Sequence, residues 1–131
     1  MTILTVDDDI DDQDIFIEAM KCIDTSITCI KADGGLEACT ILLDGDLYLS
    51  IDYIFLDINM PKMNGIEFLK MMKHDKRLNK IPVYILSTSC SPTDMATINS
   101  LGSQLLQKQN QFQKSVEMLD SVIHNKERIA R

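Results

Sequence analysis

The sequence lacks the features that mark membrane, exported and low-complexity proteins. It contains no tryptophan, only 5% aromatic residues, and just five glycines and three prolines among its 131 residues. No linker, internal repeat or biased tract is visible. No apolar run approaches the roughly 20 residues that cross a bilayer, and the amino end, Met-Thr-Ile-Leu-Thr-Val, has no basic leader of the signal-peptide type. We therefore expect no membrane contact and no export.

Paired cysteines and an excess of basic residues are absent too. The four cysteines, Cys22, Cys29, Cys39 and Cys90, form no C-x-x-C pair, so neither a zinc site nor a dithiol motif is predicted. Unpaired thiols suit a reducing compartment, and we expect a cytoplasmic protein. The net charge is -7 and the pI about 4.6. Because such a field repels phosphate backbones, direct nucleic-acid binding is not expected.

What the chain does contain is 45% hydrophobic residues, enough for one domain with a core of its own. Short apolar strands are predicted at residues 3–6, 27–32, 51–57, 83–86 and 104–107. Helices are expected from within the acidic run after residue 6, from 36 to about 45, from 64 to about 75, from 92 to 101, and from 112 onward. Five alternations of strand and helix predict an α/β fold, a doubly wound parallel sheet covered on both faces.

The segment 51–65 is the most informative part of the chain. Apolar, β-branched and aromatic residues run directly into Asp57, and a turn with proline and glycine follows. This pattern predicts a buried strand that ends at Asp57. Asn64 and Glu67, three residues apart, form a capping-box pattern and predict a helix directly after the turn. Open α/β sheets bind their ligands at the carboxyl ends of strands, so Asp57 is predicted to be a nucleophile or a metal ligand.

Other polar residues follow the remaining strands. Asp7 and Asp8 follow the first strand, Ser87 the fourth and Lys108 the fifth, and parallel strands bring all of them to one edge with Asp57. Three clustered carboxylates repel unless a cation neutralises them. Mg²⁺ fits because it takes carboxylates and leaves positions for phosphate oxygens. Lys108 and Ser87 suit a phosphoryl group beside the metal, and Asp57 as nucleophile would form an aspartyl phosphate.

These residues resemble those of the receiver domains of two-component response regulators, and the resemblance covers essentially the whole chain. The family has an acidic pair after the first strand, here Asp7 and Asp8. Its phosphoacceptor loop, D-x-x-M-P-x-x-[DN]-G, stands here as D-I-N-M-P-K-M-N-G at 57–65. Ser87 and Lys108 match the Ser or Thr and the lysine that follow the fourth and fifth strands.

The resemblance implies a flavodoxin-like fold with strand order 2-1-3-4-5 and a single receiver domain over 1–131, without an output domain. It implies that a sensor histidine kinase or a histidine phosphotransfer protein transfers a phosphoryl group to Asp57. Mg²⁺ would be bound directly by Asp8, Asp57 and the backbone carbonyl of Asn59, and through water by Asp7. The chain would be no enzyme beyond its own phosphorylation and dephosphorylation, and would act on an unknown downstream protein.

Two positions near the fifth strand depart from the family's pattern. Gln109 follows Lys108 where a proline is usual, and Leu105 stands where an aromatic residue is usual. Lys108 is also one residue closer to Gly102 than is usual. We expect phosphorylation of Asp57 to survive these departures and the signalling face at the fourth helix and fifth strand to differ. A pseudo-receiver, a binding module of this fold that is never phosphorylated, remains the alternative.

The remaining polar and sulfur residues are assigned structural roles. The extra acids Asp9, Asp11, Asp12 and Asp14 are expected to be solvated charges at a helix start, with Asp9 the one able to reach a metal. We expect His74 and His124 at the surface, Cys90 partly buried, and Met60, Met63, Met71 and Met72 as core filling.

Two other readings of the acidic run fail on a required residue. An EF-hand loop starting at Asp7 needs glycine at its sixth position, which is Asp12. An aspartyl-phosphate hydrolase signature would need Thr or Val at the position of Asp11, and the chain has no space for that family's cap domain.

Overall fold

Five parallel strands form one central sheet in the computed structural model, which describes residues 1–58 and 64–130, with side chains as far as residue 124. The strands are β1 (Thr2–Val6), β2 (Thr28–Ala32), β3 (Tyr53–Asp57), β4 (Val83–Ser87) and β5 (Gln104–Gln107). The helices are α1 (Ile10–Ile23), α2 (Gly35–Leu42), α3 (Gly65–His74), α4 (Pro92–Ser100) and α5 (Phe112–Ala130). The strand order is β2-β1-β3-β4-β5, which confirms the predicted fold and order.

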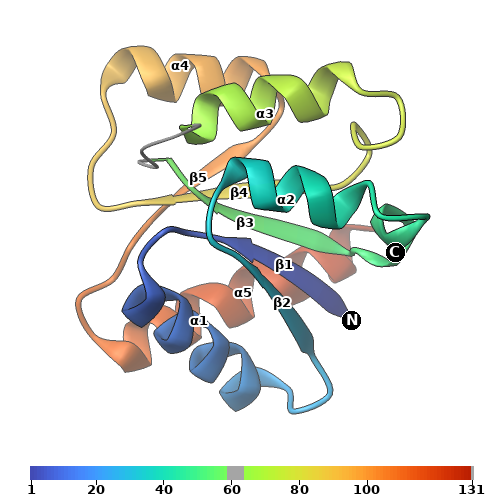
Figure 1. The fold of residues 1–131 in the computed structure, drawn as a ribbon. Helices are drawn as coiled ribbons and strands as arrows, with labels where there is room; N and C mark the ends of the chain where they lie inside the picture. The colour runs from blue at the N-terminus through green and yellow to red at the C-terminus, as the bar shows by residue number, and fades with distance from the viewer. Residues whose placement is uncertain (59–63, 131) are drawn as a thin grey trace.

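The sheet separates two hydrophobic cores, with α2, α3 and α4 over one face and α1 and α5 over the other (Figure 1). Residues of β3 alternate between them. Ile54 and Leu56 belong to the core under α2, α3 and α4, whereas Tyr53 and Phe55 belong to the core under α1 and α5. A strand buried on both faces needs apolar residues at consecutive positions, which explains the continuous apolar run before Asp57.

Phe55 is the centre of an aromatic group on the face covered by α1 and α5. Its ring centroid lies 5.0 Å from that of Phe16 in α1 and 5.4 Å from that of Tyr84 in β4. Aromatic pairs at such distances stabilise beyond the area they bury, by roughly 0.5–1.5 kcal/mol each. The group therefore ties α1 to the two strands that end at Asp57 and Ser87.

The connection between α2 and β3 differs from the prediction. Helix α2 ends slightly earlier than expected. The N–H of Leu43 makes the last bond to a carbonyl four residues back, that of Cys39, and Gly45 then reverses the chain with a φ of 59°. A 3-10 helix, η1 (Leu47–Ser50), follows and was not predicted. A helix this short shows no periodicity in the sequence.

Side chains cap the starts of three helices, and the cap at Asn64 confirms the predicted pattern. Asp9, Asn64 and Ser91 each accept a backbone N–H three residues later, at the starts of α1, α3 and α4. Among the described residues, none of the helices combines the length and the apolar character that a membrane span requires.

Candidate functional site

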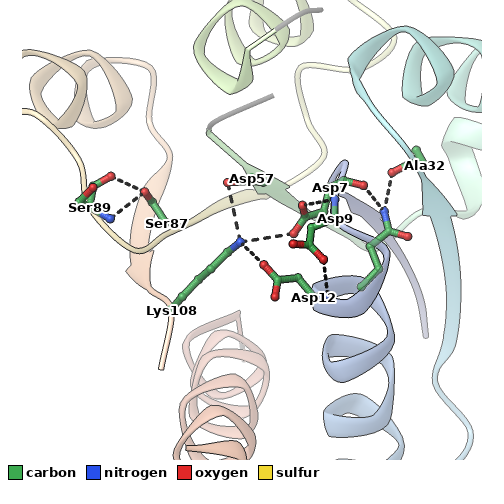
Figure 2. A network of polar contacts seen from close by, with 9 residues as sticks. Asp7, Asp9, Asp12, Ala32, Asp57, Ser87, Ser89 and Lys108 are labelled. Carbon is green, nitrogen blue, oxygen red and sulfur yellow. Dashed lines mark hydrogen bonds and ion pairs between the residues drawn. The ribbon is translucent and has the colours of Figure 1, made fainter. Parts of the chain in front are cut away.

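The polar residues at the carboxyl ends of β1, β3 and β5 meet at one edge of the sheet (Figure 2). Oxygen atoms of Asp7, Asp8 and Asp57 all lie within 4.8 Å of one another. Lys108 Nζ lies 3.4 Å from Asp7 Oδ2 and 3.9 Å from Asp57 Oδ1. Asp8 is exposed, whereas Asp7 and Asp57 are almost fully buried. The structure therefore brings together the carboxylates and the lysine that the sequence predicts to converge.

Gly65 explains how α3 can begin directly against the end of β3. A Cβ atom at this position would lie 2.6 Å from Ile58 Cα and 2.7 Å from the carbonyl oxygen of Asp57. The Gly65 N–H donates a hydrogen bond of 2.9 Å to the carbonyl of Ile58. Since both neighbours are backbone atoms, no side chain fits here. The glycine that ends the 57–65 motif is thus required by the close approach of two backbone segments beside Asp57.

Gln13, which the sequence analysis did not single out, holds the carboxyl end of β1. Its buried side-chain amide donates to the carbonyl of Asp7 at 2.7 Å and to the carbonyl of Ala32 at 2.6 Å. The N–H of Asp9 meanwhile donates to Asp7 Oδ1 at 3.0 Å. Both the backbone and the carboxylate of Asp7 are therefore oriented by the first turn of α1. The sequence did contain a signal for this role, because Gln13 is a polar residue on the apolar stripe of a predicted helix.

Asp12 corrects the prediction for the extra acids. We expected a solvated helix-start charge, but Asp12 Oδ2 lies 3.1 Å from Lys108 Nζ, closer than the oxygens of Asp7 or Asp57. The first turn of α1 faces the end of β5, and strand-end reasoning does not reveal such a contact. Asp14, two residues further along α1, is exposed and pairs with Lys31 at 3.3 Å as a surface charge.

Asp9 and Asp11 agree with the expectation for the extra acids. Asp9 is exposed, and its carboxylate caps α1 by accepting the N–H of Asp12 at 3.1 Å. Asp11 is exposed in the first turn, where its negative charge interacts favourably with the positive end of the helix dipole.

The charges in the cluster are not balanced by Lys108 alone. Burial, together with the charge of Asp57, raises the pKa of Asp7 to about 6, although the N–H of Asp9 and the ammonium of Lys108 act against the rise. Burial on its own lowers the pKa of Lys108, but the hydrogen bond to Asp12 and the charges of the three carboxylates outweigh it, so that this pKa is raised. Excess negative charge on a set of oxygen donors is the setting that a hard divalent cation such as Mg²⁺ prefers.

Ser87 lies at the end of β4, and its hydroxyl bonds to the loop that follows. The hydroxyl donates to the carbonyl of Ser89 and accepts the N–H of the same residue at 3.2 Å. The carbonyl of Ser87 accepts the N–H of Lys108 at 2.9 Å. Figure 2 shows the Ser87 and Ser89 pair apart from the group around Lys108 Nζ. Ser87 is thus placed next to the lysine by its backbone, while its hydroxyl is directed to the loop.

The two departures near β5 have different environments. Leu105 is partly buried and packs against the core under α2, α3 and α4. Gln109 is exposed, and its side-chain amide donates to the carbonyl of Gln107 at 3.0 Å. Among the described residues, no hydrogen bond or ion pair joins Leu105 or Gln109 to the carboxylates of the cluster. Neither residue therefore takes over the role of a motif residue.

The other sequence predictions concern residues outside the cluster. His74 and His124 are exposed, Cys90 is partly buried, Met72 is buried, and Met71 packs against the same core, all as expected. Asn59, the predicted third metal ligand, and Met60 and Met63 lie outside the described residues.

Comparison with known proteins gives consistent matches. The family described as response regulator receiver domain matches residues 3–120. The chain is 30% identical over 125 residues to the two-component response regulator ARR17 of Arabidopsis thaliana, over 89% of this chain and 80% of that protein. The structure is similar to that of the phosphorylated cyanobacterial phytochrome response regulator RcpA, with a TM-score of 0.81, 27% identity, and coverage of 92% and 89%. It is also similar to the Mn²⁺-bound form of response regulator Rcp1, with a TM-score of 0.78, 28% identity, and coverage of 92% and 90%.

Proposed function

The chain belongs to the family of response regulator receiver domains, and on that premise we propose that Asp57 accepts a phosphoryl group in a Mg²⁺-dependent step. The observation that carries the proposal is the cluster in which oxygens of Asp7, Asp8 and Asp57 lie within 4.8 Å of one another. Lys108 Nζ, 3.9 Å from Asp57 Oδ1, supplies a positive charge for a phosphoryl oxygen.

The donor we propose is a phosphohistidine of a sensor histidine kinase or a histidine phosphotransfer protein, since receiver domains work with these proteins. An oxygen of the Asp57 carboxylate attacks phosphorus, so a P–O bond forms while the P–N bond to the imidazole breaks. The electron pair of the broken bond stays on the ring nitrogen, and the ring leaves as neutral imidazole with its proton on the other nitrogen. Attack of water on the phosphorus later releases inorganic phosphate and restores Asp57.

The clustered residues fit a divalent cation as cofactor. All three donors are carboxylates, the ligand type that a hard divalent cation prefers, and two of them, Asp7 and Asp57, are almost fully buried. Asp8 and Asp57 are proposed as direct ligands and Asp7 as a ligand through water, while the Asn59 carbonyl, also proposed, lies outside the described residues. When bound, the cation offsets the charge of the carboxylates and of the incoming phosphoryl oxygens. A structural relative bound to Mn²⁺ supports a divalent cation, and Mg²⁺ is our specific proposal.

The output we propose is a change in protein binding in the cytoplasm, with no reaction on any other substrate. The phosphoryl group would attract the ammonium of Lys108 and the hydroxyl of Ser87, which now bonds to Ser89. Because Ser87 ends β4 and Lys108 follows the adjacent strand β5, their movement would shift the loops after β4 and β5 together. Such a shift alters partner affinity only as far as the partner distinguishes the two states.

The test is the intact mass of the protein after incubation with a small acyl phosphate, with and without Mg²⁺. We expect a Mg²⁺-dependent gain of one phosphoryl group in the wild type and none in Asp57→Asn. Asp33→Asn is the matched control, because Asp33 follows the neighbouring strand β2 but is exposed and lies outside the cluster. Labelling of Asp57→Asn would show a different acceptor. No labelling of a folded wild type, by either an acyl phosphate or a kinase, would favour the pseudo-receiver.

A further inference from the structure

Lys108 has a carboxylate partner outside the acidic cluster. Three carboxylates of the described residues lie within 4 Å of its Nζ, and the shortest distance, 3.1 Å, is to Asp12 Oδ2 (Figure 2). Asp7 and Asp57 belong to the group of oxygens that could share one cation, whereas Asp12 does not. Asp12 comes from the first turn of α1, while Lys108 follows β5, 96 positions away in the chain. The contact therefore joins α1 to the end of β5.

Binding of a cation makes Asp12 the more important partner. A divalent ion on the oxygens of Asp7 and Asp57 offsets the negative charge that attracts Lys108, and the ion and the ammonium repel each other. Asp12 keeps its charge and stays within hydrogen-bond distance of Nζ. In the cation-bound, unphosphorylated protein, the pairing of Lys108 with α1 is thus favoured over its pairing with Asp57.

Lys108 also borders empty space, which allows its ammonium to change partners. A cavity of about 120 Å³ lies between α1 and α5, with Asp12, Asp57 and Lys108 in its wall together with apolar side chains that include Phe16 and Met118. Movement of a side chain in a close-packed interior displaces its neighbours, but movement along a cavity does not. The side chain of Lys108 is also 22% exposed, so that water can solvate the ammonium during the change.

We propose that Asp12 is a positioning residue that holds Lys108 against α1, and that a phosphoryl group on Asp57 acts by drawing the ammonium away from Asp12. This inference rests on the proposed function. The Asp12–Lys108 pair stabilises the unphosphorylated arrangement, and its separation opposes the binding of Lys108 to the phosphoryl group. The strength of the pair therefore sets how readily the domain switches, since a ligand shifts such an equilibrium only by its differential affinity for the two states.

The experiment compares Asp12→Asn with Asp14→Asn. Both substitutions remove one negative charge from α1 and keep the size of the side chain, but Asp14 pairs with the exposed Lys31. The probe is beryllium fluoride, a non-covalent tetrahedral mimic of the phosphoryl group, titrated at saturating Mg²⁺ so that changes in cation affinity do not contribute. Because a partly exposed ion pair contributes up to about 1 kcal/mol, we expect Asp12→Asn to bind the mimic roughly three- to fivefold more tightly than the wild type. Asp14→Asn should bind like the wild type.

The same pair of substitutions in Lys108→Ala shows whether Asp12 acts through the lysine. Without the ammonium, Asp12→Asn should affect the dissociation constant no more than Asp14→Asn does. A merely structural role of Asp12 would persist in this background. Asp12→Glu, which restores the charge, should return the affinity toward that of the wild type.

The outcomes separate this inference from the proposed function. Equal affinity of Asp12→Asn and Asp14→Asn for the mimic overturns the inference, and so does a tightening that persists in Lys108→Ala. In either case, labelling of wild-type Asp57 by the acyl phosphate leaves the proposed function standing. A folded wild type that neither is labelled nor binds the mimic overturns both.

Discussion

The two halves of the candidate site are built differently. The acidic half consists of Asp7, Asp8, Gln13, Asp57 and Gly65, and the lysine half consists of Ser87, Leu105, Lys108 and Gln109. In the acidic half, buried hydrogen bonds and backbone contacts under 3 Å fix the strand ends. In the lysine half, the Ser87 hydroxyl bonds to the loop after β4, Gln109 is exposed, and the side chains of Leu105 and Lys108 are only partly buried. The comparison indicates that the geometry of the acceptor tolerates little change, whereas the lysine half can diverge while the acceptor is retained.

The largest effect is expected from Gly65→Ala, which tests how tightly the acidic half is built. The new Cβ would lie 2.6 Å from Ile58 Cα and 2.7 Å from the Asp57 carbonyl oxygen, so α3 must move away from β3. Overpacking of this kind costs about 3 kcal/mol, and labelling of Asp57 should fall with it. Urea unfolding and intact mass are the measurements.

Gly34→Ala is the control for that substitution. A Cβ at Gly34 meets no atom within 4 Å, and the φ of 177° is extended backbone that alanine adopts easily. A surface substitution without new contacts changes stability by less than about 0.5 kcal/mol. If Gly65→Ala were equally harmless, close approach would not be the reason for glycine beside the acceptor.

The second prediction makes the same change in both halves, Gln13→Leu and Gln109→Leu. The first removes two buried hydrogen bonds, to the carbonyls of Asp7 and Ala32, and should cost about 2 kcal/mol because the buried Asp7 carbonyl loses a donor. The second removes an exposed bond to Gln107 and a long contact with the sulfur of Met118, and should cost less than about 0.5 kcal/mol. Chemical denaturation measures both. Equal losses would contradict the difference between the halves.

The third prediction concerns pH and the buried carboxylate of Asp7. Its pKa is about 6 in the folded protein against 3.8 as the ordinary value, so between these values the folded state binds a proton that the unfolded state does not. Ionisation of the buried Asp7 therefore lowers the free energy of unfolding, and this cost is fully present only above pH 6. It is relieved as pH falls and Asp7 takes up a proton. Asp7→Asn has no such charge, so in the presence of a chelator we expect it to be more stable than the wild type at pH 7. This advantage in the free energy of unfolding should narrow by about 1 kcal/mol at pH 5.

Urea titrations at the two pH values provide that measurement. A difference that stays constant, or that widens as pH falls, would show that the pKa of Asp7 is not raised. Repeating the titration at high Mg²⁺ gives a check on the metal proposal, because a bound cation favours the ionised carboxylates. The wild type should then gain stability over Asp7→Asn at pH 7.

The smallest effect is expected from Leu105→Tyr, which restores the aromatic residue usual in the family. Leu105 is partly buried on β5 and packs on the core under α2, α3 and α4, so we expect stability to change by less than about 1 kcal/mol. The rate of Asp57 labelling should change less than twofold. A large loss of labelling would show that the lysine half controls the acceptor after all. Leu105→Ile is the control for altered packing.

Much of the fold and part of the site were predictable from local patterns. Apolar runs bounded by turns predicted all five strands, and the capping-box pattern at Asn64 predicted the start of α3. The convergence of Asp7, Asp57 and Lys108 followed because parallel strands share a carboxyl edge. The η1 helix and the end of α2 were missed, since short turns depend on single backbone conformations and not on periodicity.

The sequence by itself determined the order of strands and helices, the carboxyl edge at which the acids and the lysine meet, and the family to which the motif belongs. These properties follow from periodicity and from the geometry that every parallel sheet shares. Only the tertiary structure decided that Gln13 holds the end of β1, that Gly65 has no room for a side chain, and that Asp12 is the nearest partner of Lys108. Each of these depends on how α1 and α3 are rotated and packed against the sheet. That packing is determined by contacts between residues far apart in the chain.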